Sequence, residues 1–599
     1  MSPRPTLQDL VHPANDRDER AAALLAPSRE ALSYEALRRQ TTAVIAALRH
    51  AAVDRRDRVA VVLPNGPEMA AATVAIASGA VCAPLNPGYG EEEFRFYLTD
   101  LEPAALLLPA EDRGPARAVA TALGIRCLDA RWESDWPAGC FEIDGGVVPA
   151  CPADDPPHPE DGALLLHTSG TTSRPKLVPL SHANLCSSAR NIARTLELSP
   201  RDRCLNMMPL FHIHGFVAAL LASLASGGSV ACTPGYRDGR FLPWLEELQP
   251  NWYTAVPTVH QAILTELARH PAGTAANRLR FARSSSAPLP PAVMRELEAA
   301  LHAPVIEAYG MTEAAHQMAS NPLPPGERKP ASVGLAAGPE MAVMDDAARV
   351  LPAGTTGEIV IRGDNVTRGY ANDPQANLKA FAAGWFRTGD QGYIDAAGYF
   401  YITGRLTEII NRGGEKVSPR EVDEALFEHA AVREAATFGV RHATLGEDVV
   451  AAVVLKDAAT ATANEIRASL FGRLADFKIP SQLVVVDEIP KGATGKIQRF
   501  GLEARLAERL KPAFVRPRDA IEAHVAAIFC DVLGIDTVSA FDNFFALGGD
   551  SLRGFQVLTR LRAQLRVDVS IHELFREPTV AQLATVVTRL RQEGERVAP

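Results

Sequence analysis

The chain has 599 residues, which is too long for one hydrophobic core, so several domains are expected. Its hydrophobic content of 47% and charged content of 22% are typical of globular proteins. The net charge of −10, without a long Lys/Arg run, gives no indication of nucleic-acid binding. The opening residues MSPRPTLQDL lack the apolar core of a signal peptide, so we expect none, and the apolar stretches are too short and interrupted to predict a membrane span. Eight scattered cysteines without a CxxC pair argue against a zinc site or a disulfide framework, so we expect a cytoplasmic protein.

The first two-thirds of the chain alternate helical patterns with short runs of Val, Ile, Leu and Ala. Buried strands are predicted at Arg58–Pro64, Ala104–Ala110, Gly162–Thr168 and Gly228–Pro234, and a helix at Glu68–Gly79. Continuous apolar strands separated by helices are typical of parallel sheets covered on both faces. We therefore expect a large α/β region.

The pattern changes after Gly369. Residues Trp385–Arg405 alternate aromatic and polar side chains around an Asp-Ala-Ala-Gly turn, which predicts a β-hairpin or part of a barrel. Beyond it, a helix is predicted at Pro419–His429, a strand at Asp448–Leu455, then a second helix and a strand at Gln482–Val486. The fold class is thus a multidomain α/β protein with a small α+β part and an all-α tail.

Four parts of the chain are predicted from these changes of pattern. They are a large N-terminal domain (1–405), a smaller α+β subdomain (406–507), a charged linker (508–519) and an all-α four-helix bundle (520–595).

The predicted strand Gly162–Thr168 runs into the loop TSGTTSRPK, residues Thr168–Lys176. Backbone N–H groups and hydroxyls of such a loop can donate to phosphate oxygens, and the lysine adds a positive charge. The loop lacks the GxxxxGK[ST] frame of a Walker A motif, so a different phosphate site is indicated. A flexible polar loop is the alternative interpretation of this segment alone.

The segment FFALGGDSL precedes an apolar stripe that predicts a helix packed in a small bundle. The stripe consists of Leu552, Phe555, Leu558, Leu561 and Leu565. Gly548 and Gly549 allow a tight entry turn, and Ser551 follows at the helix N-terminus. The positive end of the helix dipole suits a covalently attached phosphodiester there, whereas an N-cap serine is the more common use of such a residue.

Further motifs follow the phosphate loop in order: EAYGMTEAAH (Glu307–His316), WFRTGD (Trp385–Asp390), Gly404–Arg405 and PKGATGKIQR (Pro490–Arg499). Together these stretches resemble the adenylate-forming superfamily, which contains acyl-CoA synthetases, firefly luciferases and the adenylation domains of nonribosomal peptide synthetases. The resemblance covers about residues 30 to 500. Domains 1–405 and 406–507 would then be the large and the mobile parts of an adenylation enzyme.

The resemblance implies ATP and Mg²⁺ as cofactors. In the family the Ser/Thr/Gly loop holds the β- and γ-phosphates. This maps to Thr168, Ser169, Gly170, Thr171, Thr172 and Lys176. Ser173 and Leu177 stand where relatives usually have Gly, but every hydrogen-bond donor is retained.

The resemblance also assigns roles to the other motif residues. Tyr309 would stack on adenine, Thr312 would contact the α-phosphate, Glu313 would bind Mg²⁺, and Asp390 and Arg405 would hold the ribose. Without the family, these residues have ordinary interpretations, such as a core tyrosine or a hairpin aspartate.

The last motif would supply the catalytic lysine, which maps to Lys496, with Lys491 as the weaker candidate. In the family the small subdomain rotates after adenylation, and its hinge position falls on Thr407. The loop Asn411–Pro419 would then line the path of the thiol.

The acid pocket of relatives begins at PLFHIHG, residues 209–215. His212 stands where domains selective for α-amino acids usually have Asp, which speaks against an amino-acid substrate. The sequences of these motifs resemble those of the oxalate-CoA ligase branch, and RSSSA (Arg283–Ala287) is one of them. The substrate residues that this implies are His212, His214, Ser284, Ser285, Ser286, Gly310 and His316. Because a small diacid needs cations or hydroxyl donors for its second carboxylate, we expect oxalate or a similar short diacid.

The tail resembles acyl and peptidyl carrier domains, whose phosphopantetheine would be attached to Ser551. The resemblance implies as partners a phosphopantetheinyl transferase and an acyl-accepting enzyme acting in trans. The first interpretation is an enzyme that adenylates a small acid and loads its own carrier. The alternatives are a ligase that releases acyl-CoA, and a carrier scaffold with an inactive adenylation region.

Overall fold

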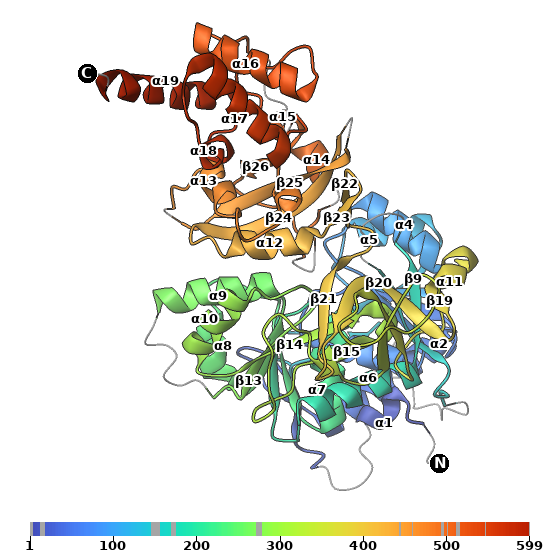
Figure 1. Ribbon diagram of the computed structural model, residues 1–599. Helices are drawn as coiled ribbons and strands as arrows, with labels where there is room; N and C mark the ends of the chain where they lie inside the picture. Colours follow the sequence, from blue (N-terminus) through green and yellow to red (C-terminus); the bar gives the residue numbers. More distant parts are fainter. Residues whose placement is uncertain are drawn as a thin grey trace. The chain divides into compact units, whose positions relative to one another are not determined.

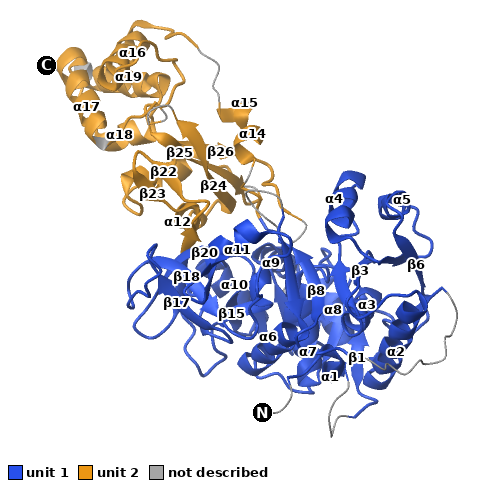
Figure 2. Ribbon diagram, turned by 90° about the vertical axis from the view of Figure 1, so that its right-hand side faces the viewer, with its two compact units in different colours: residues 1–402, 493–496 blue, residues 403–492, 497–599 orange. Residues whose placement is uncertain are grey.

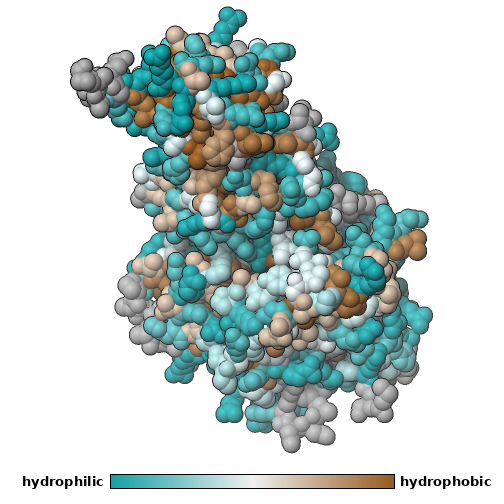
Figure 3. All heavy atoms as spheres, in the orientation of Figure 1, coloured by the Kyte–Doolittle hydropathy of each residue, from teal (hydrophilic) through white to brown (hydrophobic). Residues whose placement is uncertain are grey.

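The structure is a computed structural model that divides into two compact units, residues 1–402 with 493–496 and residues 403–492 with 497–599 (Figure 2). It describes residues 4–11, 18–144, 156–168, 175–270, 278–442, 445–457, 459–492, 496–499, 501–510, 515–545 and 547–597. The domain boundaries expected from the sequence remain predictions. No helix in the described ranges is long and apolar enough to cross a membrane. Hydrophilic side chains dominate the face drawn in Figure 3, with hydrophobic ones in smaller groups.

The largest sheet of unit 1 has nine strands, and those from β14 to β1 run parallel. Its strands β13, β14 and β15 are labelled in Figure 1. In spatial order the strands are β16 (Leu335–Ala336), β15 (His316–Ser320), β14 (Val305–Met311), β13 (Phe281–Ser284), β12 (Trp252–Ala255), β10 (Arg203–Asn206), β11 (Ser229–Cys232), β1 (Ala22–Leu25) and β2 (Leu32–Ser33). The carboxyl ends of its parallel strands therefore meet at one edge, where ligand sites of such sheets form.

A seven-stranded sheet and a five-stranded sheet contain the other strands described in unit 1, although residues 403–405 of the five-stranded sheet are grouped with unit 2. The seven-stranded sheet contains β7 (Glu142–Ile143), β6 (Arg126–Arg131), β5 (Ala105–Pro109), β3 (Arg58–Val61), β4 (Val81–Pro84), β8 (Gly162–His167) and β9 (Leu177–Ser181). The five-stranded sheet contains β17 (Glu340–Met344), β18 (Gly357–Arg362), β20 (Trp385–Ile394), β19 (Phe381–Ala382) and β21 (Phe400–Arg405), which pairs with β20.

The helices of unit 1 cover these sheets and fill the space between them. They are α1 (Leu7–Val11), α2 (Tyr34–His50), α3 (Pro67–Ala77), α4 (Glu91–Leu101), α5 (Pro115–Ala122), α6 (His182–Thr195), η1 (His214–Leu221), α7 (Ala222–Ser226), α8 (Phe241–Leu248), α9 (Pro257–Arg269), α10 (Pro291–Leu301), η3 (Thr312–Ala314) and α11 (Pro374–Ala380). Every residue of α3 is buried, and α3 contacts strands of both large sheets. A helix that is apolar all round belongs in the centre of a core.

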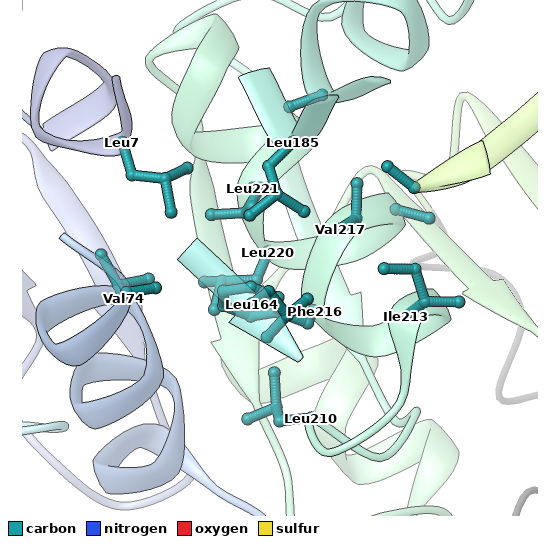
Figure 4. Packing of buried hydrophobic residues seen from close by; sticks show 14 of the residues in the cluster. Leu7, Val74, Leu164, Leu185, Leu210, Ile213, Phe216, Val217, Leu220 and Leu221 are labelled. Atoms are coloured by element: carbon teal, nitrogen blue, oxygen red, sulfur yellow. The ribbon is translucent and has the colours of Figure 1, made fainter. Parts of the chain in front are cut away.

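Helix η1 packs in the same core (Figure 4). Phe216 and Leu220 of η1 lie beside Leu164 of β8, and Val74 of α3 belongs to the same buried cluster. The segment has π-helical hydrogen bonding, which is uncommon and often marks a functional site. Its first residue is His214, so the core fixes the place of one of the predicted substrate residues.

Unit 2 contains the α+β region and the helical tail. Its sheet comprises β23 (Glu415–Val417), β22 (Ile410–Arg412), β25 (Gly446–Leu455), β24 (Val432–His442) and β26 (Gln482–Val485), which pairs with β25. The helices before the tail are α12 (Pro419–Phe427), α13 (Ala463–Ala468), η4 (Asp476–Lys478), α14 (Leu502–Arg505) and α15 (Ala507–Leu510). The predicted fold class is confirmed, but the sequence missed β24, the long partner of β25.

The tail helices α16 (Ala520–Leu533), α17 (Ser551–Leu565), α18 (Ile571–Arg576) and α19 (Val580–Val597) share one apolar core. The predicted stripe on α17 is wrong in part, because Leu552 is 72% exposed and Phe555 is 56% exposed. Leu561 of the stripe is fully buried, as is Val557, which lies four residues before it and was not part of the stripe. An i, i+3 series drifts around a helix of 3.6 residues per turn, so only its later members reach the core.

Replacing Gly549 with alanine should destabilise the tail helices, because an added Cβ would lie 2.3 Å from a ring carbon of the fully buried Phe544. Overpacking of this kind costs about 1–3 kcal/mol. Hydrogen exchange of α16 and α17 amides in the full-length chain should therefore accelerate. Unchanged protection in Gly549→Ala would show that the turn adapts and that this close approach is not required.

Candidate active site

The phosphate loop connects β8 to β9, which form an antiparallel hairpin. Its two ends are joined: the Thr168 N–H donates to the Lys176 carbonyl at 2.8 Å, and the Lys176 N–H donates to Thr168 Oγ1 at 3.1 Å. Four of the predicted phosphate ligands lie outside the described residues: Ser169, Gly170, Thr171 and Thr172. The hairpin thus fixes the entry and the exit of the loop.

Lys176 and Glu313 both interact with Tyr370. The Lys176 Nζ lies 4.5 Å from the centre of the Tyr370 ring, and the Tyr370 hydroxyl donates to Glu313 Oε1 at 2.8 Å. Tyr370 therefore contacts both the ammonium group of Lys176 and the buried carboxylate of Glu313. Such a pair suits a phosphate chain with a bound Mg²⁺, since the lysine can bind phosphate and the carboxylate can bind the ion. The sequence analysis missed Tyr370, since a single Tyr after Gly369 gives no chemical signal.

The EAYGMTEAAH motif is a tight reversal of the chain. Strand β14 ends at Met311, η3 supplies Thr312 and Glu313, and β15 returns from His316. Thr312 is half-buried and Glu313 is buried.

The Tyr309 hydroxyl donates to the Asp390 carboxylate, and both residues are buried. The structure thus brings together the side chains that the sequence assigned to adenine and ribose. The hydrogen bond between them was not foreseen.

A second group of predicted residues surrounds His214. Its Nε2 lies 2.6 Å from Thr254 Oγ1, and its Nδ1 lies 3.0 Å from Ser286 Oγ. The His316 ring centre is 5.1 Å from that of His214, and neither His316 nitrogen has a hydrogen-bond partner among the described residues. Buried polar atoms are rarely left without partners, so this position favours a polar ligand.

The serine triplet after β13 extends this group. Ser284 and Ser285 are fully buried, and neither hydroxyl has a partner within the described part of the chain. Ser286 adopts a φ of 74°, a strained conformation of the kind found at functional sites. We call His214, His316 and Ser284–Ser286 the polar cluster.

The histidines here are held neutral. Burial and the positive charge of Arg283 keep the pKa values of His214 and His316 well below the ordinary value for histidine. Burial also lowers the pKa of His212 to about 3, and His212 Nδ1 accepts a hydrogen bond from the His214 N–H at 3.3 Å. These side chains can therefore donate and accept hydrogen bonds, while Arg283 carries the local charge.

The remaining predicted residues lie in the later part of the chain. Lys496 is half-buried and is grouped with unit 1, whereas Lys491 forms a 2.9 Å ion pair with Glu434 in unit 2. Arg405 belongs to unit 2, and its carbonyl accepts from the backbone of a turn that contains the exposed Thr407.

Ser551 is the first residue of α17, and Asp550 is the N-cap. The Asp550 carboxylate accepts a hydrogen bond from the Arg553 N–H at 2.8 Å. The alternative interpretation of Ser551 as the helix cap is therefore wrong, because Asp550 has that role.

Three family models match the chain. Residues 11–371 match the AMP-binding enzyme model, residues 421–496 the AMP-binding enzyme C-terminal domain, and residues 523–587 the phosphopantetheine attachment site. These matches define a nucleotide-binding enzyme joined to a carrier-type domain. The chain belongs to the family of AMP-binding enzymes.

Individual relatives agree with this assignment. The oxalate–CoA ligase of Arabidopsis thaliana is 45% identical over 452 residues, which cover 74% of this chain and 87% of the relative. The ATP-bound structure of MatB from Rhodopseudomonas palustris has a TM-score of 0.75 and 30% identity, covering 84% of this chain and 99% of MatB. The predicted class, an adenylate-forming acid–thiol ligase with ATP and phosphopantetheine as cofactors, agrees with this family.

One solved structure matches nearly the whole chain. The McyG A-PCP structure has a TM-score of 0.76 and covers 97% of this chain and 98% of its own. At 20% identity this likeness concerns the fold alone.

Replacing Gly310 with alanine should disturb the polar cluster. An added Cβ at Gly310 would lie 2.0 Å from the His316 carbonyl oxygen, so β15 and the His316 ring must shift. Misplacement by about 1 Å can cost about 100-fold in rate, so acid-dependent ATP–pyrophosphate exchange should fall at least about tenfold.

Gly162→Ala is the matched control, because its added Cβ would meet Val81 at an ordinary 3.5 Å. Normal exchange activity in both variants would contradict the assignment of the polar cluster to the acid.

Proposed function

We propose that this enzyme activates a short dicarboxylic acid, oxalate or a close relative, as an acyl adenylate and transfers it to a thiol on its own carrier domain. The polar cluster carries the proposal. Two buried histidines and three serines stand together, and several of their polar atoms have no partner in the described residues. A second carboxylate would satisfy them, whereas an apolar acid would leave them unpaired at a cost of about 1–3 kcal/mol per group.

Similarity to the Arabidopsis oxalate–CoA ligase supports the same acid. His316 would donate from one of its ring nitrogens, neither of which has a partner in the described residues, and the hydroxyls of Ser284–Ser286 would add short donors suited to a compact anion. His214, already bonded to Thr254 and Ser286, would hold Ser286 in place. Gly310 keeps the space in front of His316, because any side chain there would collide with the His316 backbone. His212, whose ring accepts a hydrogen bond from the His214 N–H, would border the same acid.

In the first reaction, one carboxylate oxygen of the acid attacks the α-phosphorus of ATP and pyrophosphate leaves. Both reactants are anions, so catalysis depends on positioning and on neutralisation of charge. Thr168 and Lys176, with the loop between them, would hold the β- and γ-phosphates. Thr312 would contact the α-phosphate, and Lys496 would neutralise charge as it develops.

The nucleoside would be held near the carboxyl end of β14, just before Thr312. Tyr309 would stack on adenine, while the Asp390 carboxylate, already bonded to the Tyr309 hydroxyl, would accept from the ribose hydroxyls. Arg405 would join them at the ribose. This arrangement would fix the α-phosphate relative to the acid.

Glu313 fits the requirement for Mg²⁺. It is a buried carboxylate whose neighbour Tyr370 also contacts the phosphate-loop lysine, and Mg²⁺ prefers carboxylate oxygens together with substrate phosphates. The bound ion would supply positive charge at the phosphates.

The second reaction needs a thiol, and Ser551 fits as its attachment point. Asp550 caps α17, so the cap does not require the Ser551 hydroxyl. The phosphopantetheine on Ser551 would supply the thiol that displaces AMP from the adenylate. The small subdomain would rotate about the turn at Thr407, next to the boundary between the compact units, and so switch the enzyme from the first reaction to the second. The loop Asn411–Pro419 would then line the path of the thiol. A transferase that loads Ser551 and an acceptor of the acyl group would be the partners.

Release of acyl-CoA is the second candidate function. It is favoured by the similarity to proteins named CoA ligases, which cover most of the chain before the carrier domain. In that case the carrier would serve another acyl group.

Lys496→Ala should abolish adenylation. Loss of one preorganised positive charge at a developing anion costs about 100- to 1,000-fold in rate. Lys491→Ala is the matched control, because Lys491 is in an ion pair with Glu434 and should be dispensable for the chemistry. ATP–pyrophosphate exchange measures both, and full exchange activity in Lys496→Ala would refute the assignment of this lysine.

Ser551→Ala separates the two candidate functions. If the carrier accepts the acid, the variant should keep ATP–pyrophosphate exchange but lose all labelled acid bound to protein. Ser570→Ala, which removes a helix cap in the same domain, is the control and should still be loaded. Equal release of acyl-CoA by the variant and the unaltered protein, without protein-bound acid in either, would favour the ligase.

A further inference from the structure

A fully buried arginine lies behind the polar cluster. Arg283 is in β13, directly opposite Thr254 of β12 in the parallel register, and its exposed fraction is 0%. Its guanidinium donates to Thr254 Oγ1 at 3.4 Å and to Gln317 Oε1 at 3.2 Å, while its Nε has no partner. Both acceptors are neutral.

Arg283 forms no ion pair with any residue that the structure describes. Burying a guanidinium is costly unless an anion compensates it, which is why buried charges are usually paired. Although burial lowers the pKa of Arg283, to about 9, the side chain is still protonated at neutral pH. The fold therefore holds an uncompensated positive charge in its interior.

The contacts of Arg283 lead directly to the polar cluster. The Thr254 oxygen that accepts from Arg283 is also 2.6 Å from His214 Nε2. Gln317 is the neighbour of His316, and Ser284 follows Arg283 in the chain. Arg283 thus stands behind the groups proposed to bind the acid and is linked to His214 by two hydrogen bonds through Thr254.

We propose that Arg283 is a specificity-determining residue whose positive charge selects acids that carry a second carboxylate. This inference rests on the proposed function. In the proposed reaction the reacting carboxylate faces the ATP phosphates, so its charge would not balance the guanidinium. A second carboxylate at His214 and Thr254 would lie on the side of Arg283 and would balance its positive charge. A monocarboxylic acid of the same size leaves the buried charge unbalanced, and the enzyme should discriminate against it.

The test compares oxalate with glycolate, which has an uncharged hydroxymethyl group in place of the second carboxylate. The measured quantity is the ratio of the two kcat/KM values in ATP–pyrophosphate exchange. Arg283→Gln removes the charge but keeps hydrogen-bond donors, and it should lower the oxalate-to-glycolate ratio at least about tenfold, the effect of roughly one neighbouring charge interaction. Arg283→Lys keeps the charge and should retain most of the preference.

Arg203→Gln is the matched control. Arg203 begins β10 in the same sheet, and its guanidinium donates to the Leu248 carbonyl at 2.6 Å, so its loss should leave the ratio unchanged. Should Arg283→Gln not fold, Arg283→Met provides a second charge-free variant, since apolar replacement of a buried charge is often tolerated.

Two results would overturn the inference. One is an oxalate-to-glycolate ratio of kcat/KM that is unchanged in the charge-free variant. The other is an equal fall of kcat/KM for both acids in that variant, with no recovery in Arg283→Lys. A failure of the proposed function looks different. In that case the unaltered enzyme itself shows no preference for oxalate or malonate over monocarboxylic acids.

Discussion

The hydrogen bonds of His214 to Thr254 and Ser286 are the interaction on which the rest of the site depends. They join the first residue of η1 to β12 and to the segment after β13, at the carboxyl edge of the nine-stranded sheet. Because η1 is packed between the large sheets, the imidazole cannot move without disturbing the core. The site is therefore rigid and polar, and it favours a small ligand rich in hydrogen-bond acceptors.

The same construction would bring acid and nucleotide together in the proposed reaction. Strand β14 carries Tyr309, and the reversal through η3 places Glu313 next to Tyr370 and returns the chain at His316. A few residues of one motif would thus connect the base, the metal and the acid. Such coupling suits a reaction in which two anions must be aligned before either can react.

Much of this could be predicted from the sequence, since apolar strands and glycine-rich loops are local signals. His214, His316 and the serines are predicted from the resemblance of their motifs to the oxalate-CoA ligase branch, because a buried histidine or serine alone has an ordinary structural interpretation. Arg283 and Tyr370 were missed, because their roles depend on which strands become neighbours. The stripe on α17 failed for a similar reason: spacing alone does not show which turn of a helix meets the core, and Leu552 and Phe555 remain exposed.

The central claim is that the polar cluster, with the buried charge of Arg283 behind it, binds a short diacid that is activated and transferred to Ser551. The most direct measurement is the intact mass of the phosphopantetheinylated protein after incubation with ATP and equal concentrations of oxalate, malonate, glycolate and hexanoate. The account predicts a mass increase that corresponds to a dicarboxylic acyl group. A mass increase from hexanoate, with none from either diacid, would contradict it.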